Sequence, residues 1–331
     1  MKKIRRVLFA VRNPEAARQP GFAKAIQVAR AFGARLDLFH ALTDAVFIEL
    51  GRYEDHTVDK LRERVEEEAR LPLVRLCAVA RRHGVEAESS VEWDYPPHEA
   101  IVRRANAVGA DLIVAECHKG VRTRPWLIHL TDWELLRTSP VPVLLIKNDK
   151  PYRRPLTLAA VDPAHTHAKP RGLDTDIVGA AREFSQHLRG ALHMAHANYP
   201  TIVGIPELQS SANRKWATLS YDELKEQERQ AFEEFRTQAG LMRTRAHIVE
   251  GNPVKVIPRL ARELGAGIVV MGALSRSGPT RLFIGNTAER VLESLPCDVL
   301  VIKAGALATR VAPQTKGMRV VSPTALAPGA S

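Results

Sequence analysis

The sequence predicts an α/β protein with two tandem doubly wound domains, each a five-stranded parallel sheet flanked by helices. Two observations support this fold class. Residues 97–147 and 253–303 align without a gap at a constant offset of 156 residues, a period that fits a duplicated domain and is too long for a solenoid repeat. Each half also alternates short, nearly continuous apolar segments with amphipathic ones, as expected for buried parallel strands joined by crossover helices.

The first half contains one predicted strand for each of its short apolar or alternating segments. These strands are RRVLFAV (5–11), RLDLFHA (35–41), VEAESSVEW (85–93), DLIVAE (111–116) and VPVLLIK (141–147). The predicted helices are GFAKAIQVARAFG (21–33), a charged segment over about 53–83, residues 97–108 and LTDWELLRT (130–138). Gly33 is expected to end the first helix, because glycine is favoured in a left-handed C-cap. Right-handed crossovers then give a doubly wound sheet.

The second half repeats this order of elements. Its predicted strands are PLTLAAV (155–161), ALHMAHA (191–197), RTRAHIV (243–249), GIVVMG (267–272) and DVLVIK (298–303). A long helix is predicted over SYDELKEQERQAFEEFRTQAG (220–240), and it is expected to end at Gly240.

Composition and repeat together predict the domain boundaries. Residues 1–149 are expected to form the first domain and 150–304 the second, with the linker inside KNDKPYRRP (147–155). Residues 305–331 are rich in Ala, Pro and Thr and have no periodicity, which predicts a disordered tail.

The net charge of +11 comes from dispersed basic residues without interleaved aromatics, so a basic solvated surface is expected rather than a specific nucleic-acid site. No apolar run is long enough to cross a bilayer, and MKKIRRVLFAV is interpreted as a strand rather than a signal peptide. A cytoplasmic location is therefore expected. The three cysteines form no C-x-x-C pair, which argues against a disulfide framework or a zinc ribbon. Cys117 is interpreted as a small buried residue, with a thiol role left as the alternative.

A glycine-rich stretch, GALSRSGPTRLFIGNTAERV (272–291), joins a predicted strand to a predicted helix. Gly272 has no Cβ where the chain leaves the strand, and Gly278 and Gly285 allow a ligand to approach the backbone closely. The amides of Gly285, Asn286 and Thr287 lie at a helix N-terminus, which favours an anion. The stretch is neither a Walker A loop nor G-x-G-x-x-G, so a plain loop with a helix cap remains the alternative.

The segment VVMGALSRSGPTRLFIGNTAERVLESLPCDVLVIK (269–303) resembles the C-terminal signature of the universal stress protein family, whose ATP-binding members carry G-x2-G-x9-G-(S/T). GNTAERV, together with TDWELLRTSPVPVLLIK in the first half, resembles the tandem subfamily represented by universal stress protein E. The resemblance covers about residues 3–304 and implies the adenine nucleotide alpha hydrolase-like fold.

The resemblance implies an adenine-nucleotide site, with ATP as the expected ligand, in the second domain. The chain carries G-x2-S-x9-G-N here: Gly272 and Gly285 match, Ser275 replaces the second glycine, and Asn286 stands where Ser or Thr is usual. The extra Cβ of Ser275 is expected to weaken ATP binding or abolish it.

Three further positions complete the implied site. Asp162, after the first strand of the second domain, takes the place of the family's nucleoside-binding aspartate. Ala197 is expected to offer backbone groups to the base edge, and Thr287 to add a side-chain donor beside the phosphates.

The first half departs from the motif, and it is expected to have lost the nucleotide. Arg12 stands in place of Asp162, and a carboxylate, Glu116, in place of Gly272. Lys119 and His129 replace the remaining motif positions. The basic loop with His118, Lys119, Arg122 and Arg124 is interpreted as solvated surface, with a different ligand as the alternative. Trp126 and Trp133 are candidates to fill the space of a nucleotide.

No nucleophile–base pair or metal-hydrolase motif is present, so slow ATP hydrolysis is the only enzymatic activity expected. Asp162, His165 and His167 form a weak candidate metal site without an evident fourth ligand. His193 and His196 alternate on a strand and are interpreted as packing residues, and Asp132 and Glu134 as helix-surface residues.

The expected function is regulatory binding during stress, through unidentified protein partners. Two alternatives stay open: an interaction scaffold without a nucleotide, and a carrier of an apolar or lipid-like molecule in the first-domain cavity. The resemblance implies that the halves pack as a pseudo-symmetric pair through VPVLLIK and DVLVIK, whose backbone edges need partners. A homodimer is open as well.

Overall fold

The computed structural model describes residues 3–16, 18–43, 46–47, 55–117, 125–164, 172–199, 221–273, 286–303, 311–318 and 320–321. Two compact units account for the chain: Met1–Arg153 with Cys297–Ser331, and Arg154–Pro296. The repeat predicted a division between residues 149 and 150, and the units change between residues 153 and 154. The main difference between these units and the sequence repeat is that the last strand of the second half belongs to the first unit.

The first unit is built on a sheet with strand order β4-β2-β1-β5-β6-β11. Its strands are β1 (Arg6–Ala10), β2 (Arg35–Leu42), β4 (Ala87–Trp93), β5 (Leu112–Glu116), β6 (Val143–Ile146) and β11 (Asp298–Lys303). The first five are parallel, as predicted, whereas β11 runs antiparallel to β6 with Leu300 opposite Leu144. The two predicted edge strands therefore pair with each other, which brings the last strand into this unit.

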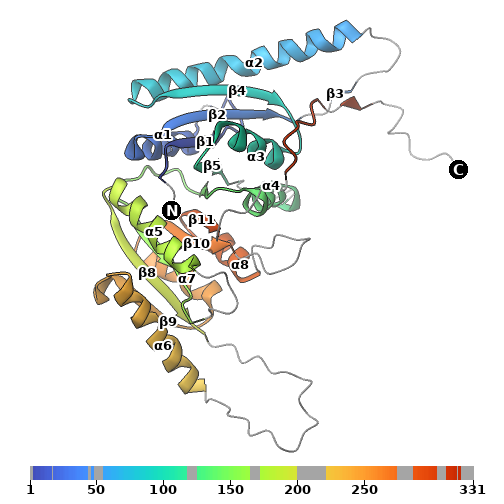
Figure 1. Ribbon diagram of the computed structural model, residues 1–331. Coiled ribbons are helices and arrows are strands. Elements are labelled where there is room, and N and C mark those ends of the chain that lie inside the picture. The colour runs from blue at the N-terminus through green and yellow to red at the C-terminus, as the bar shows by residue number, and fades with distance from the viewer. Residues whose placement is uncertain are drawn as a thin grey trace, which may run out of the picture. The chain divides into compact units, whose positions relative to one another are not determined.

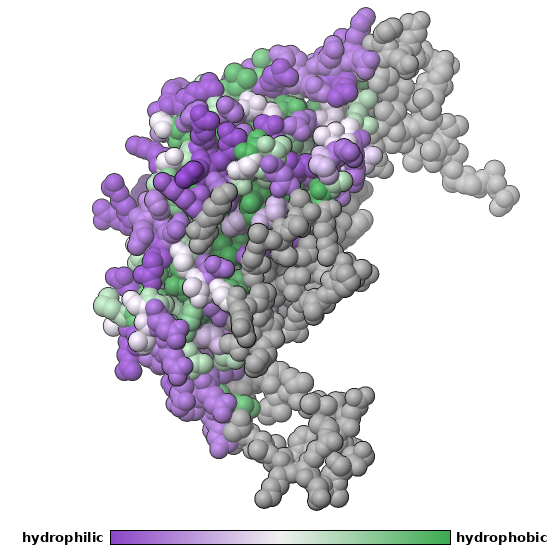
Figure 2. Space-filling view, in the orientation of Figure 1, coloured by the Kyte–Doolittle hydropathy of each residue, from purple (hydrophilic) through white to green (hydrophobic). Residues whose placement is uncertain are grey.

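Helices cover both faces of this sheet (Figure 1). They are α1 (Pro20–Phe32), α2 (Asp55–Arg82), α3 (Pro97–Val108) and α4 (Pro125–Thr138). Gly33 ends α1 with a φ of 63°, as predicted, and its N–H caps the last carbonyls of the helix. The charged helix α2 packs on β4, and hydrophilic side chains dominate the surface over it, with smaller apolar areas (Figure 2).

The second unit repeats the same winding with strand order β10-β7-β8-β9, all parallel. Its strands are β7 (Leu156–Ala160), β8 (Ala191–Asn198), β9 (Ala246–Glu250) and β10 (Ala266–Ala273). Its helices are α5 (Leu173–His187), α6 (Tyr221–Gln238), α7 (Pro253–Glu263) and α8 (Asn286–Ser294), with a 3-10 turn, η3, at Arg243–Arg245. The order matches β5-β1-β2-β4 of the first unit, so the two halves share one fold.

A buried ion pair fixes β11 in the first unit. Lys24 of α1 places its ammonium 2.5 Å from a carboxylate oxygen of Asp298, and both side chains are almost fully buried. The other carboxylate oxygen accepts the backbone N–H groups of Lys147 and Asn148, and the Tyr152 hydroxyl donates to the first. Burial and the neighbouring Asp298 raise the pKa of Tyr152 well above its ordinary value. This network joins a helix, the linker and the last strand.

Part of the C-terminal segment that was expected to be disordered makes defined contacts with the first unit. The buried Arg103 forms a two-fold salt bridge with Asp94 at 2.6 and 2.8 Å and donates to the Ala312 carbonyl. Lys316 donates its backbone N–H to Asp94 and places its ammonium 2.8 Å from Glu99. Beyond it, β12 (Val320–Val321) pairs in parallel with β3 (Val46–Phe47). Composition alone did not reveal these contacts, because they depend on tertiary ion pairs.

Within the described residues, no helix is both long enough and apolar enough to span a membrane.

Candidate functional site

In each sheet, two crossover connections lead from neighbouring strands toward opposite edges of the sheet. The predicted ligand site lies between these two strands. In the second unit this point falls between the neighbouring strands β7 and β10, and open α/β sheets bind ligands there, beyond the carboxyl ends of the strands. Asp162 follows β7 and Ala197 lies near the end of β8. Gly272 lies near the end of β10, and Asn286 begins α8, as predicted. The topology therefore places these four positions at one edge of the sheet.

Several predicted site residues lie outside the described residues. These are Ser275, Gly278 and Gly285 of the glycine-rich stretch and His165 and His167 of the candidate metal site. Thr287 is described as an exposed residue in the first turn of α8, where an α-helix has N–H groups without intrahelical partners. Among the described residues, no group of three or more His, Cys, Asp or Glu side chains is placed to hold a metal ion. The metal candidate and the phosphate loop stay predictions.

Gly272 has a packing role that the sequence analysis missed. It precedes the last residue of β10, Ala273, so it lies close to where the chain leaves the strand, as expected. A Cβ built on it would lie 2.8 Å from a methyl carbon of Leu173 and 3.1 Å from one of Ile177, both on α5. The close packing of α5 on β10 therefore favours glycine at this position, with or without a ligand.

Asp162 combines a fixed backbone with an accessible carboxylate. Its N–H donates to the Asp174 carboxylate at 3.1 Å, which holds the chain where β7 ends. Its side chain is 50% exposed, and one carboxylate oxygen lies 3.7 Å from Nδ1 of His196. A carboxylate placed in this way can accept hydrogen bonds from hydroxyl or amino groups of a ligand.

Behind Asp162, a buried polar cluster lies between β8 and α6. The His196 ring is 2% exposed, stacks on Phe232 and points Nδ1 at the Val161 carbonyl, 3.1 Å away. Its Nε2 lies 3.4 Å from a carboxylate oxygen of the buried Glu228. His196 is therefore more than the packing residue that the sequence predicted.

The Val161 carbonyl indicates which ring nitrogen of His196 carries a hydrogen. Because the Val161 carbonyl only accepts, Nδ1 carries a hydrogen, and Nε2 then faces the Glu228 carboxylate.

The first unit has a cavity of about 240 Å³ at the same edge of its sheet. It is lined mostly by apolar side chains, together with His40, Thr43, Thr131 and three charged residues, Arg12, Glu116 and Asp132. Trp133 is not among the described residues that line the cavity, and the side chain of Trp126 lies outside the described residues, as do those of His118, Lys119, Arg122, Arg124 and His129.

Glu116 takes a position that an anionic ligand would favour. One of its carboxylate oxygens accepts the backbone N–H of Gly21, in the first turn of α1, at 2.6 Å. A Cβ on Gly21 would lie 2.3 Å from Cγ of Glu116, so the contact requires glycine. A helix N-terminus attracts negative charge, and here a side chain of the protein supplies it.

Asp132 corrects one expectation of the sequence analysis. It was placed on a helix surface, yet it is buried and lines the cavity, whereas Glu134 forms a partly exposed salt bridge with Arg137. Burial and the nearby Asp132 raise the pKa of Cys117 to about 12. The Cys117 thiol is therefore protonated at neutral pH, which argues against a reactive thiol, but the residue is only partly buried, whereas the sequence predicted a buried one.

Comparison with known proteins gives a consistent result. The model of the universal stress protein family matches residues 3–147 and 177–303. Over 305 residues the chain is 28% identical to universal stress protein E of Escherichia coli K12, with 89% of this chain and 93% of that protein covered. Universal stress protein E of Photorhabdus laumondii is 26% identical over 303 residues, covering 89% and 94%.

Solved structures agree with this match. A Pseudomonas aeruginosa UCBPP-PA14 chain assigned to the universal stress proteins superimposes with a TM-score of 0.69 at 25% identity, covering 91% of this chain and 93% of that one. A universal stress protein from Archaeoglobus fulgidus DSM 4304 gives a TM-score of 0.58 at 19% identity, over 90% and 96%, which supports the fold alone. The duplicated domain and the family match in both halves lead to one conclusion: the chain is a tandem-domain member of the universal stress protein family.

Proposed function

We propose that this tandem universal stress protein binds an adenine nucleotide, ATP in the first instance, in its second domain and acts in stress response as a regulatory binding protein. The observation that carries the proposal is the half-exposed carboxylate of Asp162 at the switch point, on a residue whose backbone N–H donates to Asp174. At the corresponding edge of the first unit, Arg12 has no acceptor for a hydrogen bond from a nucleoside. The carboxylate of Glu116, which is bound to the N-terminus of α1, would repel the phosphates.

Each described residue has a defined part in this proposal. Asp162 accepts hydrogen bonds from the nucleoside, and the backbone near Ala197 lines the base edge. The first turn of α8, with Asn286 and Thr287, supplies N–H groups for the phosphates. Because Ser275 adds a Cβ where the family motif has a glycine, we expect micromolar or weaker affinity. Binding is the expected activity, with slow hydrolysis of ATP at most, and a cytoplasmic location stays a prediction.

Titration calorimetry with ATP tests the proposal. Gly285→Val should abolish binding, because a branched Cβ obstructs the phosphate loop, and Ser275→Gly should strengthen binding by restoring room. Binding by Ser275→Gly without binding by the wild type would identify a relic site. If no form binds ATP, the glycine-rich stretch is a loop and helix cap, and the scaffold interpretation replaces this one.

The cavity of the first unit favours a second candidate function, the transport or sensing of a small molecule. Its volume of about 240 Å³ lies below the roughly 300–1,000 Å³ of common ligand pockets, so it suits a small apolar molecule better than a long lipid chain. Native mass spectrometry of the protein as purified tests this candidate. A copurified small molecule that is lost in an Ile101→Trp variant, which fills the cavity, would support it, whereas a protein of the mass of the bare chain would argue against it.

A further inference from the structure

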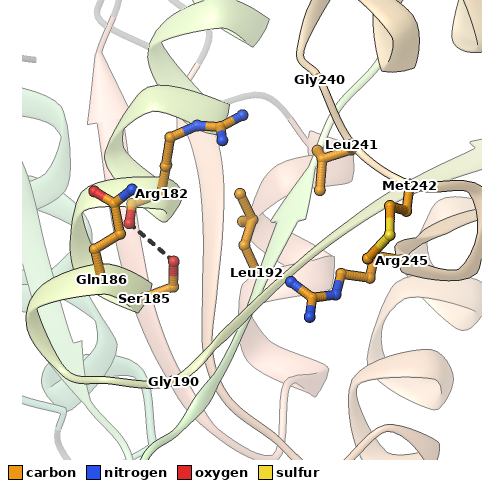
Figure 3. A pocket seen from close by; sticks show the side chains of 9 residues that line it. All are labelled: Arg182, Ser185, Gln186, Gly190, Leu192, Gly240, Leu241, Met242 and Arg245. Carbon is orange, nitrogen blue, oxygen red and sulfur yellow. Dashed lines mark hydrogen bonds between the residues drawn. The ribbon is translucent and has the colours of Figure 1, made fainter.

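A second cavity, of about 220 Å³, lies in the second unit (Figure 3). Gly190 and Leu192, at the start of β8, line it, so it lies at the opposite end of the sheet from the proposed nucleotide site. It is lined by the last turns of α5, the chain entering β8, and the chain between α6 and β9. The eight residues of β8 span roughly 26 Å at about 3.3 Å per residue, so the two sites are separated by the length of a strand.

The lining of this cavity, which we call the amino-edge pocket, carries two positive charges and no acidic side chain. The charges belong to Arg182 of α5 and Arg245 of η3. Figure 3 shows these two side chains reaching the pocket from different elements, with Leu192 between them in this view. The serine and glutamine of the lining, Ser185 and Gln186, are uncharged, so the pocket has a net positive charge.

Within the described residues, neither arginine has a carboxylate partner of the kind that neighbouring arginines have. Arg236 and Arg243 both contact Glu233, at 3.0 and 3.5 Å. Within the described part of the chain, Arg182 donates only to a backbone carbonyl, that of Ala239, and Arg245 has no ion pair. A guanidinium group presents five N–H donors in a planar fork that matches carboxylate and phosphate oxygens, so both groups keep donors for a ligand.

Capping of the C-terminus of α6 explains the position of Arg182 but not that of Arg245. The carbonyl of Ala239 lies just after α6, and a cation near a helix C-terminus is stabilising, which accounts for one N–H of Arg182. Arg245 makes no such contact in the described part of the chain, yet it lines the same pocket. An account based on capping therefore leaves the second charge unexplained.

The remaining walls suit a ligand with a short apolar portion. Leu192 and Leu241 are buried in the wall, and Met242 lies at the pocket with 60% of its surface exposed. The volume is too small for a typical drug-sized ligand, whose pockets measure about 300–1,000 Å³. A compact metabolite fits these limits.

We propose that the amino-edge pocket binds a small organic phosphate. Arg182 and Arg245 would hold the phosphate group, because a dianion can pair with two guanidinium groups at once. Leu192 and Met242 would contact the carbon portion. The site would be independent of the nucleotide crevice, which gives the second domain two separate ligand sites.

Titration of the full chain with glycerol 3-phosphate, followed by NMR or calorimetry, tests the proposal. We expect a dissociation constant in the millimolar range or below, weakened about tenfold or more in Arg245→Met. The matched control is Arg243→Met, because Arg243 is exposed, lies two residues away and is outside the pocket lining. This control should bind as the wild type does. Arg182→Met should also lose binding, but Arg245→Met decides the matter if Arg182→Met fails to fold.

Two further measurements distinguish binding at the amino-edge pocket from binding at the nucleotide site and from unspecific binding of anions. Asp162→Ala should leave glycerol 3-phosphate binding unchanged, so that failure of the nucleotide proposal does not affect this result. Propionate, a small carboxylate, should bind more weakly than glycerol 3-phosphate. The proposal is overturned if the wild type does not bind the probe, if Arg245→Met and Arg243→Met weaken binding equally, or if propionate binds as tightly.

Discussion

The ligand-facing edges of the two units carry different side chains on the same fold. After the first strand of each unit stands Arg12 in one and Asp162 in the other. Near the end of the fourth strand of the fold, the first unit has Glu116, bound to the N-terminus of α1, and the second has Gly272, packed under α5. A nucleotide would meet a built-in carboxylate in the first unit, whereas in the second it would meet a glycine of β10 and the N-terminus of α8.

The framework beneath these residues is retained in both units. His40 points Nδ1 at the Val11 carbonyl at 2.8 Å, and His196, 156 residues later, points Nδ1 at the Val161 carbonyl at 3.1 Å. The buried Glu228 beside His196 corresponds to Pro72 in the first unit, so this carboxylate has no counterpart at the equivalent position. The comparison shows that the fold is set by the retained contacts, whereas the binding properties depend on a few exchanged side chains.

The largest effect is expected at the buried ion pair of Lys24 and Asp298 in the first unit. Lys24→Met leaves the Asp298 carboxylate buried without its ammonium partner, so the free energy of unfolding should fall by about 3–5 kcal/mol. Urea denaturation measures this loss. Lys24→Met combined with Asp298→Leu should recover part of the stability, because no isolated charge remains buried. A loss below about 1 kcal/mol in the single variant would show that the pair does not fix β11.

The next effect compares the two close glycine contacts. Gly21→Ala places a Cβ against Cγ of Glu116 and breaks the contact with the N-terminus of α1, which should cost about 1–3 kcal/mol of unfolding free energy. Gly272→Ala should cost less, because its Cβ would lie 2.8 Å from the nearest atom, compared with 2.3 Å at Gly21, and it breaks no helix N-terminal contact. Chemical denaturation of both variants gives the comparison. Equal losses in Gly21→Ala with and without Glu116→Ala would contradict the assigned role of Glu116.

The smallest effect is a difference in response to pH at equivalent positions. His193 and His247 of the second unit are 2.9 Å apart, and burial lowers the pKa of both, with the neighbouring His247 and Arg245 lowering that of His193 further. A base with a lowered folded pKa is stabilising above its ordinary pKa near 6.5 and loses that contribution as the pH falls. Asp37, which corresponds to His193, has a pKa raised by burial, so its contribution is lost instead as the pH rises.

Between pH 7.5 and 5.5 the second unit should therefore lose stability through the two histidines. His247→Gln should reduce this acid sensitivity in urea denaturation, and His83→Gln, at an exposed histidine, should not. The same acid sensitivity in both variants and the wild type would exclude the histidine pair as its source.

Local signals predicted the fold closely. Pro97 at the first position of α3 and the left-handed Gly109 after it mark both ends of the predicted helix. The strands were recognisable because burial on both faces makes them apolar throughout. Asp132 was misplaced, although Leu135 and Leu136 lie three and four residues later and therefore share its buried face of α4.

Contacts between distant residues were beyond prediction from one sequence. Lys24 and Asp298 are 274 positions apart, and nothing in their local sequence marks them as partners. The same holds for Glu116 with Gly21 and for Arg103 with the C-terminal segment. In the second unit, the motif located the predicted site, but the pairing of His196 with Glu228 depends on how α6 packs on β8.

The most direct test of the difference between the two units is ATP titration calorimetry on two matched variants, Asp162→Ala and Arg12→Ala. The account predicts one ATP site per wild-type chain. Asp162→Ala should weaken binding about tenfold or more, since hydrogen bonds to a charged group are worth about 1.5–3 kcal/mol. Arg12→Ala should leave affinity and stoichiometry unchanged. Two sites per chain, or a loss of binding in Arg12→Ala rather than in Asp162→Ala, would contradict the assignment of the nucleotide to the second domain.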